Sequence, residues 1–171
     1  MTNNLTLATS YKAKAIVNEE DSLKLEVFNG TCDLTPIYNL RRSFFRSYPE
    51  ALIKDELDKT ASHFLVLNGE TEIFCLTVHK DELPSERYVD ANQLYSMKPG
   101  VYELKALCCK EPINEVTLRK AIELTFANLI EYFHSVPPNS LLIAVSSKNA
   151  KNITRYSKIG FSLFATFLIV V

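Results

Sequence analysis

The spacing of hydrophobic and polar residues predicts that the first part of the chain forms strands and short helices. Residues 11–17 and 23–28 alternate polar and apolar side chains around a polar turn, as the two arms of a β-hairpin do. Thr35-Pro36 offers a capping residue followed by proline, which predicts a helix start, and a second short helical stretch is expected to run to about Leu57. The apolar residues of the first helix share one face, and they are Ile37, Leu40, Phe44 and Phe45.

A second hairpin is predicted at Asn68-Gly69, the strongest short-range signal in the chain. Residues 63–67 and 70–78 are strand-like runs on either side, and an Asn-Gly pair favours the type I′ turn that joins such strands. Residues 81–99 predict a polar loop with at most one helical turn. After this loop, residues 101–109 predict a central strand.

The longest helix is predicted over residues 115–134. Its apolar residues recur at the spacing of one helical face, which predicts a stripe that packs on the sheet. Pro137-Pro138 cannot continue the helix, so the chain passes there to the next strand. The predicted stripe consists of Leu118, Ile122, Phe126, Leu129 and Phe133.

The last third of the chain predicts a strand, a short helix and a sharp stop. The apolar run at residues 140–146 lies between a Pro-Pro-Asn break and a polar turn, which is typical of a strand buried on both faces. Residues 149–159 predict a helix, because Gly160 can take the left-handed conformation that ends one. Tyr156 then lies one turn before the helix ends, and residues 161–171 predict a final strand at the end of the sheet.

Four residues near the end of the chain keep a characteristic spacing, and they are Asn149, Tyr156, Gly160 and Phe161. This spacing resembles the closing motif of the GNAT superfamily of N-acyltransferases, and the predicted order of elements is similar to the GNAT fold over roughly residues 36–165. The resemblance implies one domain over residues 1–171 with an α/β (α+β) fold. Its mixed, mostly antiparallel sheet carries helices on both faces and a central pair of strands that splay apart.

The first half of the chain resembles a group within that superfamily. Arg41 precedes two phenylalanines, an acidic cluster contains Asp55 and Asp58, and the Asn-Gly hairpin follows. These features resemble the opening of the autoinducer synthases and the long-chain N-acyl amino acid synthases, which commonly take the acyl group from acyl carrier protein. The resemblance implies that Arg41, Asp55 and Asp58 bind the acceptor amine. The residues alone also fit a solvated helix end for the carboxylates and a surface charge for Arg41.

The resemblance also implies where the acyl donor binds. The strand that ends near Cys109 and the strand that begins near Leu141 diverge, so their unpaired backbone groups can bond the amides of a pantetheine arm. A backbone N–H near Leu107 or Cys108 can stabilise the oxyanion. The donor-binding residues that follow are Leu107, Cys108, Cys109, Lys110, Thr117, Arg119 and Asn149.

Two side chains are candidates for proton transfer. Tyr156 can return a proton to the departing thiolate, although ordinary pKa values of ~10 for tyrosine and ~8.5 for a thiol make this step uphill by roughly 2 kcal/mol. The alternative for Tyr156 is packing on the sheet. Glu103 can accept the amine proton, directly or through water, or it can be structural. The choice depends on strand register, because a slip of one residue turns Glu103 to the other face.

The loop after the central strand contains no glycine. GNAT enzymes that use coenzyme A (CoA) usually carry spaced glycines there, so that bare backbone amides can wrap the pyrophosphate. Here the stretch runs from Lys110 to Arg119 and includes Glu111 and Glu115, whose carboxylates repel phosphate. Three possibilities stay open: a carrier-protein donor with a single phosphodiester, CoA bound by the side chains of Lys110, Thr117 and Arg119, or a fold without activity.

Composition narrows the classes of function. The chain has 171 residues, 47% hydrophobic residues and a net charge of -1, which favours one ordinary globular domain and disfavours nucleic-acid binding. We expect no membrane span, secretory signal or metal site, and therefore a cytoplasmic protein with reduced cysteines. A cysteine hydrolase is a further alternative, in which Cys108 or Cys109 is paired with a histidine; the candidates are His63, His79 and His134.

The sequence therefore predicts an N-acyltransferase. The donor is acyl-CoA or the phosphopantetheine thioester of an acyl carrier protein, and the acceptor is a small-molecule primary amine such as an amino acid. The alternative is a catalytically inactive GNAT-like protein with a binding or regulatory role. The pairing of the central strands and the direction of the candidate side chains distinguish the active transferase from the inactive protein.

Overall fold

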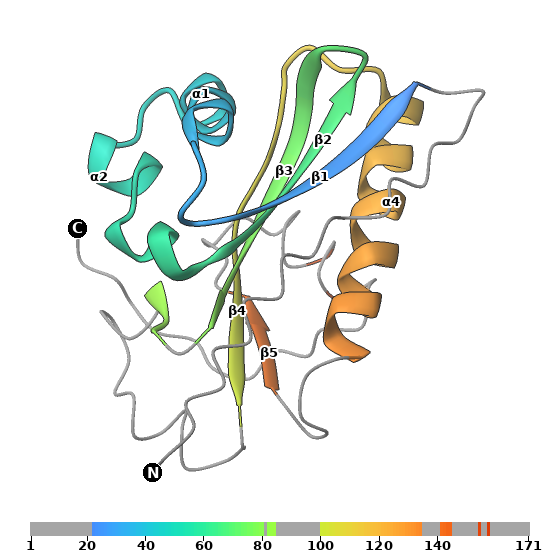
Figure 1. The fold of residues 1–171 in the computed structure, drawn as a ribbon. Helices are drawn as coiled ribbons and strands as arrows, with labels where there is room; N and C mark the ends of the chain where they lie inside the picture. The colour runs from blue at the N-terminus through green and yellow to red at the C-terminus, as the bar shows by residue number, and fades with distance from the viewer. Residues whose placement is uncertain are drawn as a thin grey trace, which may run out of the picture.

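The computed structural model describes residues 22–80, 82–84, 100–134 and 141–144, together with Thr154 and Ser157. These residues form a five-stranded sheet with helices packed against it (Figure 1). The described strands are β1 (Leu23–Asn29), β2 (Ser62–Asn68), β3 (Thr71–Lys80), β4 (Val101–Cys109) and β5 (Leu141–Ala144). The described helices are α1 (Thr35–Phe44), α2 (Glu50–Ile53), the short 3₁₀ helix η1 (Glu56–Thr60) and α4 (Glu115–His134).

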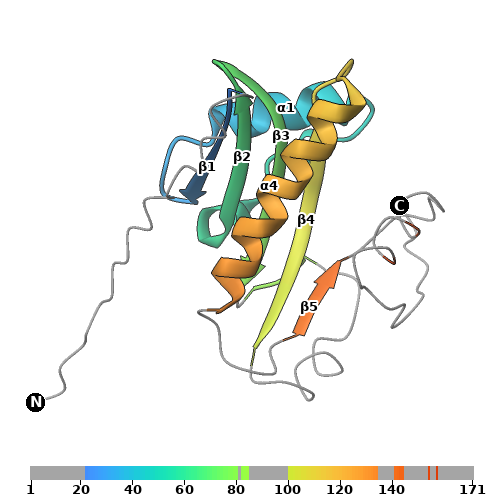
Figure 2. The ribbon, with the colours of Figure 1, turned by 90° about the vertical axis from the view of Figure 1, so that its right-hand side faces the viewer.

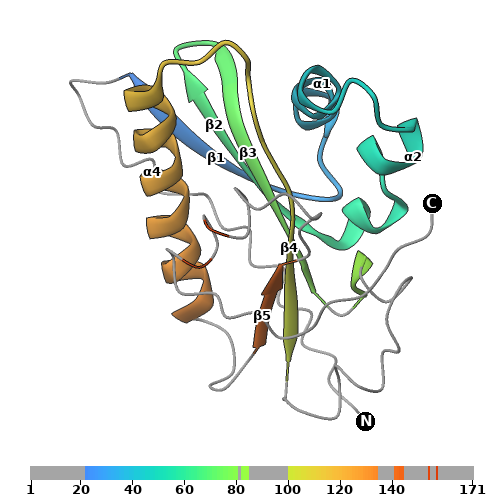
Figure 3. The same cartoon turned by 180° about the vertical axis from the view of Figure 1, so that it is seen from behind.

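The strands lie in the sheet in the same order as in the chain. β1 to β4 pair antiparallel with their neighbours, and β5 pairs parallel with β4. α4 covers one face of the sheet, and α1 and α2 lie on the other (Figures 2 and 3). The predicted mixed, mostly antiparallel sheet with helices on both faces is therefore confirmed.

The α4 face carries the larger apolar core. The predicted helix over residues 115–134 is confirmed, and all five residues of its stripe pack into this core. Ala121 and Thr125 are also fully buried, because side chains this small let the helix backbone approach the sheet closely. The strand residues in this core include Phe64, Val66, Phe74, Leu76, Val78, Tyr102 and Leu104.

The α1 face carries a smaller apolar cluster. Ile37 and Leu40 of α1 are buried against the sheet, where Leu65, Cys75 and Cys108 face them. Thr35 is the first helical residue and Leu34 is the N-cap residue, so the predicted cap by Thr35 is wrong. The Thr35 backbone N–H donates to the Asp33 carboxylate just before the helix. The predicted second helical stretch is present as two short pieces, α2 and η1.

The predicted β2–β3 hairpin is confirmed, but its predicted turn type is wrong. Asn68 pairs with Thr71, so the loop consists of Gly69 and Glu70. Gly69 has a φ of 58°, whereas a type I′ turn needs positive φ at both loop residues and Glu70 does not have it. Asn68 stays in the strand, where its side chain accepts a hydrogen bond from Ser22.

Several predicted elements lie outside the described residues. They are the strand at residues 11–17, most of the polar loop predicted over 81–99, the strand at 161–171 and most of the helix at 149–159, within which Thr154 and Ser157 are helical. The described pairing of β5 covers Val101 to Leu104 of β4. The predicted splaying of the two strands further along β4 therefore stays a prediction.

Candidate functional site

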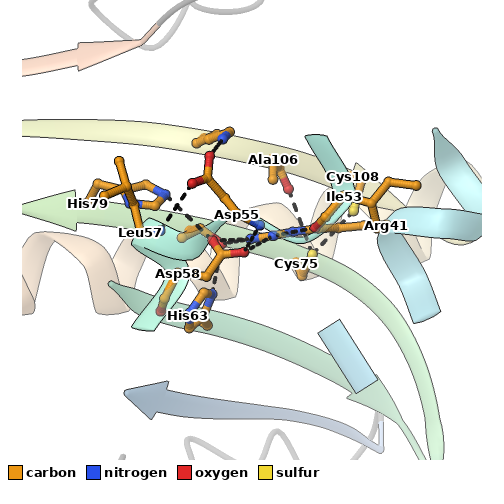
Figure 4. Close-up of polar contacts among 12 residues, drawn as sticks. Arg41, Ile53, Asp55, Leu57, Asp58, His63, Cys75, His79, Ala106 and Cys108 are labelled. Carbon is orange, nitrogen blue, oxygen red and sulfur yellow. Dashed lines mark hydrogen bonds and ion pairs between the residues drawn. The ribbon is translucent and has the colours of Figure 1, made fainter. Parts of the chain in front are cut away.

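Polar side chains gather on the α1 face of the sheet, between the strands and η1 (Figure 4). In strands, alternate residues point to opposite faces, and the apolar neighbours of these polar residues pack into the α4 core. A polar residue within an otherwise apolar strand is the sequence signal for the strand members of this cluster. Only some of these residues were predicted to be site residues. The cluster consists of Arg41, Asp55, Asp58, His63, Thr77, His79, Glu103 and Lys105.

Arg41 is the centre of this cluster. Its side chain is fully buried and donates to both carboxylate oxygens of Asp58, at 2.6 and 3.2 Å. It also donates to the Ile53 carbonyl at 2.9 Å and to the Thr77 hydroxyl at 2.6 Å, while its Nε has no hydrogen-bond partner in the part of the chain that is described. Burial lowers the pKa of Arg41, but the bonds to Asp58 outweigh this and keep the guanidinium charged. A surface position for Arg41 is therefore wrong.

The two aspartates fix η1 to the sheet. Asp55 accepts from the Leu57 N–H, and the Asp55 N–H donates to the Asp58 carboxylate, which forms a reciprocal cap at the start of η1. Lys105 of β4 donates to Asp55 at 2.5 Å. Because both aspartates are buried, the solvated helix end is wrong for them, although Glu56 beside them is exposed.

Gly30 explains how η1 can lie so close to the end of β1. A Cβ at this position would lie 2.2 Å from the carbonyl oxygen of Asp58 and from the backbone of Lys59. The Gly30 N–H also donates to the Ala61 carbonyl at 3.1 Å. The absence of a side chain at Gly30 therefore lets the acidic helix pack against β1 and sets the position of Asp58.

His63 is a fully bonded residue of the cluster. Its Nε2 lies 3.0 Å from the Asp58 carbonyl, which can only accept, so Nε2 carries the proton. Its Nδ1 lies 3.0 Å from the Thr77 hydroxyl and accepts from it. Burial lowers the pKa of His63, and the Asp58 carbonyl bond only partly opposes this. His63 is therefore an ordinary hydrogen-bonded histidine of the fold.

His79 lies two residues after Thr77 on β3 and has a different environment. Its side chain is buried, and its Nε2 is 3.7 Å from an Asp58 carboxylate oxygen, which is too long for a hydrogen bond. Burial lowers the pKa of His79 to about 4, and Lys105 and His63 add to the shift while the two aspartates oppose it. His79 is therefore neutral at pH 7.

Glu103 lies on β4 directly opposite His79 on β3. It is 2% exposed, and its neighbours Tyr102 and Leu104 point into the α4 core. The register therefore turns Glu103 toward the α1 face and into the polar cluster. This resolves which face Glu103 occupies, and its role in proton transfer stays a prediction.

A β-bulge interrupts β4 just after this point. Thr77 pairs with Lys105 and Cys75 with Cys108, so β4 has one more residue than β3 between these pairs. Ala106 has a φ of 53°, in the left-handed region. The extra residue resets the alternation, so that Leu107 and Cys109 pack into the α4 core while Cys108 faces α1. No glycine marks this bulge in the sequence, so no local pattern predicts it.

Cys108 is not a suitable nucleophile in this environment. Its Sγ lies 3.2 Å from Sγ of Cys75, and both thiols are free and fully buried. The hydrogen bond with Cys75 and burial raise the pKa of Cys108 well above its usual value, so it stays protonated at neutral pH. These observations count against the cysteine hydrolase built on Cys108.

The residues predicted to bind the donor phosphates lie at the start of α4. Lys110 is exposed, Thr117 is half-buried, and Arg119 is exposed and donates to Glu123. The Asn114 side chain accepts from the backbone N–H groups of Val116 and Thr117, at 2.8 and 3.4 Å. The first turn of α4 is therefore capped by the chain itself, and two of its amides are already occupied.

A shallow groove lies beside the same helix start. It is lined by Ser22, Leu23, Asn68, Asn114, Val116, Thr117 and Lys120, with a volume of about 400 Å³. Its lining comes from β1, the end of β2 and the first turns of α4, so it lies at the β1 side of the sheet and not beside β5. The buried polar cluster on the α1 face is separate from it.

Two of the predicted site residues, Asn149 and Tyr156, lie outside the described residues. Where side chains are described, no group of three or more His, Cys, Asp or Glu residues is placed to hold a metal ion. The described helices include none with the length and apolar character needed to cross a bilayer.

Comparisons with known proteins agree on the fold. No family model matches the chain, and no curated protein matches it by sequence. The solved structure of FeeM, an N-acyl amino acid synthase from uncultured soil microbes, is similar with a TM-score of 0.61 and 17% identity, over 85% of this chain and 81% of that one. The aminoglycoside N-acetyltransferase AAC(6')-Iy in complex with CoA has a TM-score of 0.60 and 11% identity, over 91% and 98%.

A third similar structure is an acyl-CoA N-acyltransferase from Pseudomonas aeruginosa, with a TM-score of 0.58 and 14% identity, over 85% of this chain and 92% of that one. A GCN5-related N-acetyltransferase is also among the similar structures, at a TM-score of 0.56. At these identities the likeness concerns the fold. The chain therefore has a GNAT fold, as its closing motif and order of elements predict.

Proposed function

We propose that this protein is an N-acyltransferase that moves an acyl group from a phosphopantetheine thioester to a primary amine. The observation that carries the proposal is the geometry of β4. This strand pairs with the parallel strand β5 over its first four residues, carries the buried carboxylate Glu103 there, and then bulges at Ala106. In a GNAT fold, this combination favours binding of the donor with its thioester carbonyl near the bulge and with Glu103 beside it as the base.

In this proposal the pantetheine arm binds along β4 after the described β5 pairing ends. Its amides pair with the strand, and the N–H of Leu107 or Cys108 stabilises the oxyanion. The amine nitrogen forms a bond to the carbonyl carbon, its proton passes to Glu103, and the carbon–sulfur bond breaks. Tyr156 supplies a proton to the departing thiolate.

The acceptor side of the proposed site is built on the buried cluster. Arg41 and Asp58 are bonded to each other and hold η1 against the sheet. Because both side chains are buried, they act on the acceptor indirectly, through the residues that they position. Asp55 is bonded to Lys105, whose side chain is partly exposed. We infer that Lys105 and Glu103 lie closest to the acceptor and that the aspartates position them.

The start of α4 supports a carrier-protein donor over CoA. Asn114 occupies two amides that a pyrophosphate would otherwise use, and the exposed carboxylates of Glu111 and Glu115 flank them. A carrier protein presents one phosphodiester, which needs fewer contacts. Exposed Lys110 offers a single positive charge suited to such a group.

The test is turnover by the purified protein with matched acyl-CoA and acyl-carrier donors and a panel of amino acids, read by mass spectrometry of N-acyl products. We expect product formation, with the carrier donor preferred. Glu103→Gln should reduce turnover by about 10²- to 10⁴-fold, because it removes a proton acceptor. Glu131→Gln, at an exposed glutamate near the end of α4, is the matched control and should leave turnover unchanged.

The alternative is a GNAT-like binding protein without activity, which the capped start of α4 also favours. It predicts a complex with donor or amine but no product with any pair. If the protein neither binds nor turns over any donor, the transferase proposal fails. Equal turnover by the wild type and Glu103→Gln would remove the assigned role of Glu103.

A further inference from the structure

Cys75 and Cys108 face each other across two neighbouring strands. They are direct partners in the β3–β4 register, and their Sγ atoms lie 3.2 Å apart with both thiols free. Directly opposite residues of an antiparallel pair have Cα atoms about 4.5 or 5.5 Å apart, and a disulfide takes Cα separations of about 4.4–6.8 Å. The backbone therefore allows a disulfide between these strands without a change of register.

The β-bulge in β4 creates this pair. If the pairing that joins Thr77 to Lys105 continued without the extra residue, Cys75 would lie opposite Leu107. The extra residue shifts β4 by one position, and Cys108 becomes the partner instead. The same irregularity that resets the strand thus places two sulfur atoms side by side.

The surroundings of the pair exclude two other uses of it. Cys109 packs into the α4 core and Cys32 is exposed, so neither joins the two sulfurs. A structural zinc ion takes about four ligands, and within the described ranges no group of three or more His, Cys, Asp or Glu residues is placed to hold a metal ion. The chemistry open to the pair is therefore a reaction between its own two sulfurs.

The two thiols differ in reactivity. Figure 4 shows both of them beside the Arg41 guanidinium. The hydrogen bond from Cys108 lowers the pKa of Cys75, burial opposes the shift, and the charge of Arg41 adds to it. The pKa of Cys108 is raised by the same hydrogen bond and by burial. Cys75 is therefore the thiol that more readily forms a thiolate, and Cys108 keeps its proton within reach of it.

We propose that Cys75 and Cys108 are a redox-active pair that a hydroperoxide converts to a disulfide joining β3 to β4. The Cys75 thiolate forms a bond to one peroxide oxygen, the O–O bond breaks, and a sulfenic acid remains. Cys108 sulfur then attacks Cys75 sulfur, the S–O bond breaks, and the oxygen leaves as water with the Cys108 proton. With hydrogen peroxide, two thiols are oxidised to one disulfide and the peroxide is reduced to two waters. A dithiol reductant reverses the bond by exchange.

Burial of the pair sets how an oxidant reaches it. Ile37 and Leu40 of α1 pack over the two sulfurs in the smaller apolar cluster. Hydrogen peroxide is small and uncharged, so local opening of this cluster gives it access. A bulky alkylating reagent should label Cys32 in the folded protein and the pair only after unfolding.

The first experiment needs no substrate. The folded wild type is treated with hydrogen peroxide, the remaining thiols are alkylated in denaturant, and tryptic peptides are mapped by mass spectrometry. We expect the peptides 60–80 and 106–110 to be linked, with fragment ions placing the bond on Cys108, and dithiothreitol should release them. Cys109→Ser should form the same link, because Cys109 lies on the other face of β4, and Cys108→Ser should not.

Three results would overturn the disulfide site. The pair can stay reduced in peroxide, as expected if the two cysteines only fill the apolar cluster. Cys75 can be oxidised beyond the sulfenic acid without forming the link. The bond can also join Cys108 to Cys109 within one peptide. Each of these results is visible in the wild type alone, so the test does not depend on the folding of a variant.

The second experiment asks whether the disulfide controls turnover, and this part rests on the proposed function. The N–H of Leu107 or Cys108 is the proposed oxyanion donor, and bond formation draws the two sulfurs closer by about 1 Å. Because a misplacement of about 1 Å can cost 10²-fold in rate, we expect oxidised wild type to turn over at least about 10-fold more slowly. Dithiothreitol should restore turnover.

Two variants assign that loss to the pair. Cys75→Ala leaves β4 unchanged and should keep its turnover in peroxide. Cys32→Ser removes the exposed thiol and should lose turnover as the wild type does. An equal loss in Cys75→Ala and the wild type would overturn control by the disulfide. If Cys75→Ala does not fold, recovery of the wild type in dithiothreitol, matched to release of the linked peptides, supplies the comparison.

The outcomes separate this inference from the proposed function. Unchanged turnover in wild type that carries the disulfide would overturn the control of activity and leave the disulfide site standing. If the reduced wild type turns over no donor, the proposed function fails together with the control of activity. The peptide maps still decide whether Cys75 and Cys108 form the bond.

Discussion

The two faces of the sheet bury side chains in different ways. The α4 face is filled by apolar and aromatic residues, and the rings of Tyr102, Tyr132 and Phe133 meet edge to face at centroid distances of 5.2 to 6.5 Å. The α1 face buries Arg41, Asp58 and two histidines beside a smaller apolar cluster. The α4 face is therefore stabilised by its buried apolar surface area, and the α1 face by a few specific polar contacts.

This difference predicts how each face responds to change. Apolar burial contributes roughly 25 cal/mol per Å², so losses on the α4 face scale with the atoms removed. A buried ion pair contributes little net stability, but the loss of one partner leaves a buried charge without compensation. The α1 face should therefore tolerate paired replacement better than single replacement.

The largest expected effect is that of Asp58→Ala on the α1 face. It leaves the buried Arg41 guanidinium without its carboxylate, which costs about 3–5 kcal/mol of unfolding free energy. Urea denaturation monitored by circular dichroism measures this loss. Glu50→Ala breaks an exposed arginine pair at Arg42 and is the control, for which we expect no measurable change.

A paired replacement checks the reason for that loss. Arg41→Met with Asp58→Leu removes both charges and should recover part of the stability, although the Ile53 carbonyl and Thr77 lose a donor. A double variant as unstable as the sum of the two single ones would contradict the idea that the uncompensated charge causes the loss.

The α4 face gives the next effect. Leu129 is 2% exposed, so Leu129→Ala should cost about 3 kcal/mol through lost contacts and a residual cavity. Its neighbour Ile130 is 59% exposed, and Ile130→Ala is the control, with a change within about 0.5 kcal/mol. The comparison is read from the same urea titrations. Equal losses for the two variants would show that burial does not govern this face.

The α1 face should also make stability depend on pH, and the α4 face should not. The folded pKa of His79 is about 4, below the ordinary value of ~6.5, so the unfolded chain binds more protons between these values. The free energy of unfolding should fall by roughly 3 kcal/mol as the pH is lowered from about 6.5 to 4, with no contribution above that window. His63 shifts in the same direction and adds to the fall.

A matched pair of variants isolates this term. Aspartates and glutamates also titrate near pH 4, so the wild-type slope contains their contribution. His79→Leu should flatten the slope between pH 6.5 and 4, whereas Leu129→Ala should lower stability by a constant amount and keep the slope. The same slope in the wild type and in His79→Leu would mean that the pH dependence arises elsewhere. Among the described residues, the charged and titratable groups around His79 are Arg41, Asp55, Asp58, His63, Glu103 and Lys105.

The same contrast explains what could be predicted from the sequence. α4 and its stripe followed from the helical period, because an apolar face needs only the right residues at the right spacing. The β2–β3 hairpin followed from Asn68-Gly69, although the exact loop did not, because the pairing of Asn68 with Thr71 decided it. Local patterns therefore predicted the elements.

The polar cluster was less predictable because its contacts join distant segments. Arg41 meets Asp58 and Thr77 across 17 and 36 residues, so no local window shows that these side chains become buried. The resemblance to synthases singled out Arg41, Asp55 and Asp58 but not Thr77 or Lys105, which complete the contacts. The bulge at Ala106 was also hidden, since only the β3 register reveals the extra residue.

The smallest expected effect tests how α4 is held. Asn114→Ala removes the side chain that accepts from the Val116 and Thr117 amides, which should cost about 1 kcal/mol. This is less than the loss for Leu129→Ala, because most of the stability of a helix in a protein comes from its buried face and not from its ends. Urea titration measures both losses. A larger loss for Asn114→Ala than for Leu129→Ala would mean that the capped start, and not the apolar face, holds α4 on the sheet.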